Sequence, residues 1–204
     1  MMRPDQLSEM QLDTLREVGS IGAGHAATAL SQLVGQKVDL AVPVLQLVPI
    51  GQVPEIFGGP ETLVAAVYNR LLGDLKGSIL FAAPRASSLA LVDMLRNRPA
   101  GTTKSFGRGE QGLMTHVASV LASAYLASIG RLADLSLLPA PPSFALDMAA
   151  AILEAVMLQV EQRADCALLV VTRFFENESP VDMHLFFMPD PDSLEVLLGR
   201  LGMT

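Results

Sequence analysis

The chain has 204 residues, a formal net charge of −7 and 50% apolar residues, and its mean hydropathy is +0.41. An acidic chain with no basic run and no Trp offers little to the backbone or the bases of a nucleic acid, so we expect a protein or small-molecule partner. We identify no uncharged apolar run of about 18 residues that would span a membrane, and we expect a globular, cytoplasmic protein. The single cysteine excludes an internal disulfide and a cysteine-built metal site.

Residues 8–34 show the period of one long amphipathic helix, with Ser8 and Gln11 spaced as a capping box and Gly35 at the end. The expected buried face consists of leucines and small residues, namely Leu12, Leu15, Gly19, Gly22, Ala26, Ala29, Leu30 and Leu33. A second, exposed face carries a row of polar and small residues that we call the first stripe, namely Asp13, Glu17, Ser20 and Gly24, and continues to Ser31. Such a row is either a solvated helix face or a docking surface, and the pattern alone favours the solvated face.

The rest of the first half is predicted to form a strand, a Gly- and Pro-rich connection that could hold one helical turn, a hairpin and a helix. These cover residues 39–48, 49–60, 61–83 and 86–96. Pro43 inside the first strand predicts an edge position or a bulge. Residues 98–108 are polar and rich in Gly and Thr, and we interpret them as a linker.

The second half repeats the pattern of the first. A shift of 99 residues places the apolar set Gly22, Ala26, Leu30 and Leu33 on Leu121, Tyr125, Ile129 and Leu132. The same shift places Pro43 on Pro142, and the segment that begins at Ile79 resembles the one that begins at His184. The predicted elements are a long helix, a second helix and a hairpin, over residues 110–132, 147–162 and 166–188, and a terminal helix follows the hairpin.

Two halves that are each too small for a good core would share one sheet. We therefore expect a mixed α/β (α+β) fold with a pseudo-twofold axis and a mostly antiparallel sheet. The two long helices would lie side by side on one face of that sheet. We expect a single domain over residues 1–204, with half-repeats of approximately 8–97 and 109–204.

Three alternative sites are weaker. The sequence GSIGAG at residues 19–24 suggests a nucleotide loop, but no strand precedes it, and the P-loop lysine and the dinucleotide glycine spacing are absent. These glycines are better explained by close packing on the buried side of the helix and by clearance for a partner on its exposed side. His25 and His184 have no partner at metal-ligand spacing, so we expect no metal site. Residues 149–160 could form a partner face, but a core helix is the default interpretation.

The motif around the first stripe resembles that of the CheC-type chemotaxis phosphatases, and the likeness spans almost the whole chain. The family motif is Asp or Ser, three residues, Glu, two residues, Asn, twenty-two residues and Pro. Asp13, Glu17 and Pro43 match it, whereas Ser20 stands at the Asn position. The corresponding residues of the second half are Gly112, His116, Ser119 and Pro142, of which only the proline matches. We interpret this second stripe as a degenerate site.

The resemblance implies an activity in which a helix docks on a CheY-like response regulator and positions the water that hydrolyses its aspartyl phosphate. In the family the glutamate pairs with a lysine of the regulator, and the asparagine positions the water. The regulator supplies the metal, expected to be Mg²⁺, so we expect no cofactor in this chain. The implied catalytic residues are Glu17 and Ser20, the implied partner-binding residues are Asp13, Glu17, Gly24 and Pro43, and the degenerate second site is His116, Ser119 and Pro142.

Ser20 leaves the catalytic outcome open, because its side chain is shorter than that of asparagine and a displacement of about 1 Å can cost on the order of 10²-fold in rate. The alternative is a catalytically weak or inactive adaptor that binds a response regulator or CheD, a receptor-modifying deamidase. A flagellar-switch role is a weaker alternative, because the chain ends at Thr204 without the further domain of such relatives.

Overall fold

The computed structural model describes residues 7–35, 37, 39–40, 44–159, 166–176 and 179–203. The elements of the first half are α1 (Glu9–Val34), β1 (Asp39–Leu40), β2 (Val44–Pro49), η2 (Ile50–Phe57), β3 (Leu63–Gly73), β4 (Gly77–Pro84) and α2 (Arg85–Leu95). The second half contributes α3 (Arg108–Ala133), β5 (Leu137–Pro139), β6 (Ser143–Met148), α4 (Ala149–Gln159), β7 (Cys166–Glu176), β8 (Ser179–Pro189) and α5 (Pro191–Arg200).

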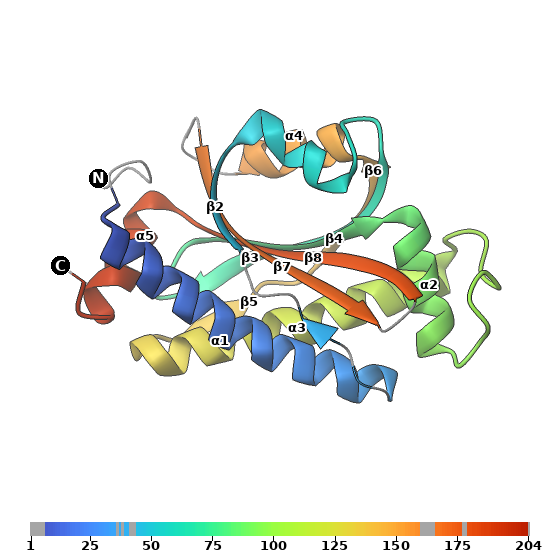
Figure 1. Ribbon diagram of the computed structural model, residues 1–204, viewed down its shortest axis with the longest axis horizontal. Helices are drawn as coiled ribbons and strands as arrows, with labels where there is room; N and C mark the ends of the chain where they lie inside the picture. The colour runs from blue at the N-terminus through green and yellow to red at the C-terminus, as the bar shows by residue number, and fades with distance from the viewer. Residues whose placement is uncertain are drawn as a thin grey trace.

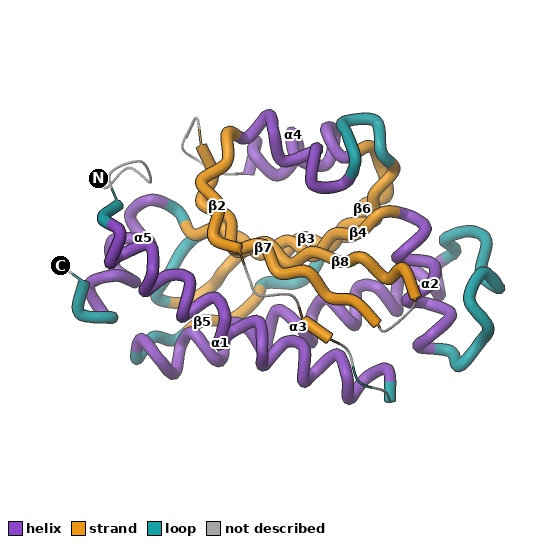
Figure 2. The backbone as a smooth tube through the Cα atoms, in the orientation of Figure 1, coloured by secondary structure: helices purple, strands orange, loops and turns teal. Residues whose placement is uncertain are grey.

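These elements form three layers (Figure 1). The long helices α1 and α3 lie side by side on one face of the sheet, and α4 and η2 cover the other face (Figure 2). Helices α2 and α5 lie at opposite ends of the α1–α3 layer (Figure 1). The predicted mixed fold, with two long helices on one face of an antiparallel sheet, is confirmed.

The helix α1 begins and ends where the sequence predicts. The Ser8 hydroxyl accepts the Gln11 backbone N–H at 3.3 Å, and the Gln11 side chain accepts the Ser8 N–H at 2.9 Å. Gly35 ends the helix at φ 71°, a left-handed conformation that glycine adopts without steric cost. The buried face is wider than predicted and includes Val18, Ala23, Ala27 and Val34, because α1 packs against both α3 and the sheet. Leu12, Ala29 and Leu33 are only half-buried.

The sheet interlocks the two halves through an exchange of their first strands. Within the described residues it has eight strands in the order β1-β7-β8-β4-β3-β5, with β2 also on β7 and β6 also on β3. The first strands of each half thus pair with the hairpin of the other half. Pro43 itself lies outside the described residues, although β1 and β2 on either side of it are at the edge of the described sheet.

A pseudo-twofold axis passes between β4 and β8. A shift of 105 residues maps Ile79 onto His184 and Ala82 onto Phe187. Ile79 is the neighbour of Phe187, and Ala82 is the neighbour of His184, so the shift exchanges the two pairs. This register agrees with the repeat that the sequence predicts.

The core has one part on each face of the sheet. Leu30 of α1 and Ile129 of α3 belong to the same cluster, as the shift of 99 residues predicts. On the other face, Val53 and Phe57 of η2 pack with Ile152 of α4 and with Phe186. The helix α4 begins at Ala149 and not at residue 147, because the strand β6 continues to Met148.

The connection between α2 and α3 is held by a buried carboxylate. Asp93 is fully buried and accepts the backbone N–H groups of Thr102 at 2.8 Å and Thr103 at 2.9 Å, together with the Thr103 hydroxyl. Burial raises the pKa of this carboxyl, but the hydrogen bonds from Thr103 and Thr102 lower it by more, so the pKa lies below its ordinary value. These hydrogen bonds fix the connection to α2. The boundaries of the half-repeats and of the linker 98–108 stay predictions.

The expectation that the chain has no uncharged stretch as long as a membrane span is wrong for the helix α3. Residues 111–130 carry no Asp, Glu, Lys or Arg, and α3 is long and apolar enough to cross a membrane by length and composition. Half of its most apolar window is buried inside the protein. The buried side chains of Leu121, Tyr125 and Ile129 belong to the core shared with α1, which explains why this helix is so apolar.

Candidate functional site

The first stripe lies on the outer face of α1, directed away from α3 and the sheet. Asp13 and Glu17 are exposed, whereas Ser20 and Gly24 are half-buried. The Asp13 carboxylate pairs with Arg16 at 2.5 Å, with both side chains more than half exposed. Such an exposed pair within one helix contributes little stability, about 0.3–0.5 kcal/mol. Glu17 makes no ion pair within the described part of the chain, so its charge is available to a docking partner.

Ser20 is held by its own helix. Its hydroxyl donates a hydrogen bond to the backbone carbonyl of Arg16 at 2.8 Å. The proton is therefore engaged, and the oxygen lone pairs are what remains for a partner or a water molecule. In this geometry Ser20 accepts hydrogen bonds, whereas a carboxamide would both donate and accept them.

The glycines of α1 serve two different purposes. A Cβ added at Gly22 would lie 2.8 Å from Cε2 of Tyr125, which is too close for an ordinary contact. A Cβ added at Gly24 would meet nothing within 4 Å. Gly22 therefore permits the close approach of α1 and α3, whereas Gly24 leaves the surface low beside Glu17 and Ser20. Both lie inside a continuous helix, which excludes the nucleotide-loop alternative.

The second stripe repeats the geometry of the first without its charge. Gly112 and His116 of α3 are exposed, and Ser119 is half-buried. The Ser119 hydroxyl donates to the Thr115 carbonyl at 2.8 Å, the same bond that Ser20 makes. Pro142 lies between β5 and β6 and is half-buried. No carboxylate stands at the positions that correspond to Asp13 and Glu17.

Sequence reasoning missed one hollow of the surface, which lies on the far side of the sheet from both stripes. Tyr68 and Arg70 of β3 line it together with residues of β6 and α4. The available signal was Arg70, the one charged side chain in the strand β3. No group of three or more potential metal ligands is found among the described residues.

Comparisons with known proteins relate the chain to chemotaxis and flagellar-switch proteins. The model of the CheC-like family matches residues 10–46, a range that includes the first stripe and Pro43. The chain is 33% identical over 200 residues to the CheY-P phosphatase CheC of Bacillus subtilis (strain 168), and the match covers 96% of both proteins. It is 36% identical over 91 residues to the flagellar motor switch phosphatase FliY of the same strain, covering 45% of this chain and 23% of FliY.

Solved structures show the same fold at low sequence identity. FliY of Thermotoga maritima superposes with a TM-score of 0.77 at 14% identity, covering 96% of this chain and 98% of that structure. A chain from the CheX–CheY–BeF₃–Mg²⁺ complex of Borrelia burgdorferi superposes with a TM-score of 0.57 at 12% identity, covering 85% of this chain and 96% of that chain.

Proposed function

Because the chain belongs to the CheC-like family, we propose that it dephosphorylates the aspartyl phosphate of a CheY-like response regulator by docking the first stripe on the regulator. The relative from Bacillus subtilis is named a CheY-P phosphatase, and a chain of the same fold from Borrelia burgdorferi is in a complex with CheY. We further propose that the protein acts in the cytoplasm, where response regulators are phosphorylated.

The observation that carries the proposal is the position of Glu17. It stands exposed two turns into a 26-residue helix whose opposite face is buried in the core. A carboxylate on such a rigid element can meet a lysine of a docked regulator at little conformational cost, and the pair gains strength as the interface excludes water. Gly24 keeps the neighbouring surface low enough for close approach.

Hydrolysis of the aspartyl phosphate requires few catalytic groups from this chain. An acyl phosphate is already reactive, so catalysis requires a water molecule held in line with the phosphorus and a cation that balances the developing charge. We propose that the regulator supplies the cation, as Mg²⁺, and that Ser20 contacts the water. Asp13 and Pro43 are assigned to partner binding on the family motif.

A second function is favoured by the hydrogen bond of Ser20. Because its hydroxyl donates a hydrogen bond to the Arg16 carbonyl, Ser20 can accept a hydrogen bond from the water but cannot also donate one to the phosphoryl group. A hydroxyl that turns toward the substrate gives up a backbone hydrogen bond of about 1 kcal/mol. The protein would then be an adaptor that binds the regulator, or CheD, with weak hydrolysis or none.

Phosphate release separates the two functions. A response regulator is phosphorylated with a small acyl-phosphate donor, the donor is removed, and the protein is added at one-tenth of the regulator concentration. If the protein is a phosphatase, we expect the whole regulator pool to lose its phosphate faster than it does spontaneously. An unchanged decay rate, together with binding to the phosphorylated regulator in the same solution, would establish the adaptor instead.

A further inference from the structure

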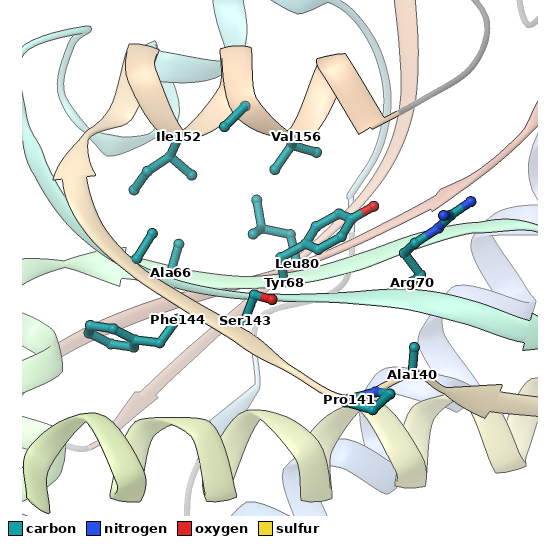
Figure 3. Close-up of a pocket in the computed structure, with 12 residues that line it drawn as sticks. Ala66, Tyr68, Arg70, Leu80, Ala140, Pro141, Ser143, Phe144, Ile152 and Val156 are labelled. Atoms are coloured by element: carbon teal, nitrogen blue, oxygen red, sulfur yellow. The ribbon is translucent and has the colours of Figure 1, made fainter. Parts of the chain in front are cut away.

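A cavity lies between the sheet and α4, on the face opposite α1 and α3. Figure 3 shows Ile152 and Val156 of α4 above it, with Ala66, Leu80 and Tyr68 on the sheet below. Its volume is about 330 Å³. Pockets that hold small ligands begin at about 300 Å³, so the cavity has room for a small molecule.

The two ends of this cavity differ in polarity. Alanine, leucine, isoleucine and valine side chains line the part beneath α4. Arg70 marks the other end, with the Tyr68 ring between it and the apolar part, and the Ser143 hydroxyl stands on the neighbouring strand (Figure 3). An apolar wall with a few convergent polar groups is the usual build of a ligand site.

The polar end is electropositive. Arg70 is exposed and makes no ion pair with the described part of the chain. A second hollow, of about 370 Å³, continues from Tyr68 and Arg70 and adds Lys76, with Asp190 as the one carboxylate among the described residues of its wall. Burial raises the pKa of the Tyr68 phenol above its ordinary value, so at neutral pH this group is a hydrogen-bond donor. The polar end therefore offers donors and positive charge to an anion.

Water is a poor occupant of the apolar end. An ordered water molecule needs two to four polar partners, and the described residues beneath α4 offer none from their side chains. A ligand whose apolar part covers these side chains would remove their surface from water, which favours binding.

We propose that this cavity binds a small amphipathic anion, a molecule with one carboxylate or phosphate head and an apolar chain or ring. The head contacts Arg70 and the Tyr68 hydroxyl, and the apolar part lies between α4 and β3. The site is separated from the first stripe by the thickness of the sheet. It therefore stands independently of the phosphatase proposal and can be occupied while a regulator is docked on α1.

Calorimetric titration with sodium decanoate, kept below its micelle concentration, tests the proposal. The matched neutral probe is decan-1-ol, which has the same chain and no charge, and decyl phosphate replaces the carboxylate by a phosphate. We expect saturable 1:1 binding of decanoate or of decyl phosphate, at least tenfold tighter than that of decan-1-ol. The tighter of the two anions identifies the head group.

Three variants locate the binding. Arg70→Gln removes the charge from the polar end and should weaken binding of the anion about tenfold or more, because the hydrogen bond between two charged groups is lost. Ala145→Phe fills the cavity from the edge strand β6 and should abolish binding. Arg108→Gln removes an equal charge from the exposed start of α3 and should change nothing.

The proposal is overturned if neither anion binds, if decan-1-ol binds as tightly as the anions, or if Arg70→Gln binds like the wild type. Arg70 is an exposed residue, so this last arm remains informative even where Ala145→Phe lowers stability.

Discussion

The helices α1 and α3 occupy equivalent places in the two halves, but their outer faces carry different charges. Both have 26 residues and lie on the same face of the sheet, and Ser20 and Ser119 make the same 2.8 Å bond to their own backbone. The outer face of α1 presents Asp13 and Glu17, whereas that of α3 presents Gly112 and His116. The two helices therefore share the spacing of their buried positions, whereas the two carboxylates of α1 are exposed and take no part in the packing.

The buried faces of the two helices are complementary rather than alike. The fully buried ring of Tyr125 on α3 lies over Gly22 of α1, and Tyr125 takes the repeat position of Ala26. The large side chains of this contact thus come from α3 and the small ones from α1. This asymmetry brings α1 close to the core while its outer face stays free for a partner.

The largest expected effect comes from Glu17→Ala. It removes the one family-matching charge that is not paired within its own helix, and we expect 10- to 100-fold weaker binding to an activated response regulator. Titration of a fluorescently labelled regulator, activated with beryllofluoride, measures this affinity. The matched control is Glu154→Ala on α4, an exposed glutamate on the other side of the sheet, which should bind like the wild type. Equal losses in the two variants would point to net charge rather than to the first stripe.

Gly22→Ala tests the contact between the helices. The added methyl group would lie 2.8 Å from the buried Tyr125 ring, so we expect the free energy of unfolding to fall by about 1–3 kcal/mol. Gly24→Ala is the matched control, because its methyl group meets nothing within 4 Å and alanine favours the helix by up to about 1 kcal/mol. Urea denaturation measures both variants. A stable Gly22→Ala protein would show that the ring has room to move.

Ser20→Asn sharpens the comparison of the two stripes. Asparagine restores the longer carboxamide of the family motif beside Glu17, and we expect the regulator's phosphate to be lost several times faster than with the wild type. Ser119→Asn makes the same change on the second stripe, where the carboxylate is missing, and should leave the rate unchanged. Equal acceleration by both variants would contradict the assignment of the site to α1.

The parts of the fold that the sequence predicts are those governed by local chemistry. The capping box at Ser8, the Gly35 end of α1 and the hairpin of β3 and β4 follow from residue types within a few positions. The shared core of Leu30 and Ile129 follows from the repeat. The exchange of first strands between the halves could not be predicted, because no local pattern specifies which hairpin a strand pairs with.

The site was predictable only in part, for a similar reason. The stripe from Asp13 to Gly24 follows from helical spacing, but the bond of Ser20 to the Arg16 carbonyl is a rotamer choice that a sequence does not show. The cavity beside Arg70 collects residues from β3, β6 and α4, which only the folded chain brings together. Pro43, which the motif assigns to partner binding, stays a prediction.

The most direct test of a single working stripe compares Glu17→Ala with His116→Ala in one assay of phosphorylated-regulator decay. These residues occupy the same place on the two helices, and each variant removes one exposed side chain from an otherwise equivalent scaffold. We expect Glu17→Ala to return the decay to the regulator's spontaneous rate and His116→Ala to match the wild type. Loss of activity in His116→Ala, with Glu17→Ala fully active, would place the working site on α3.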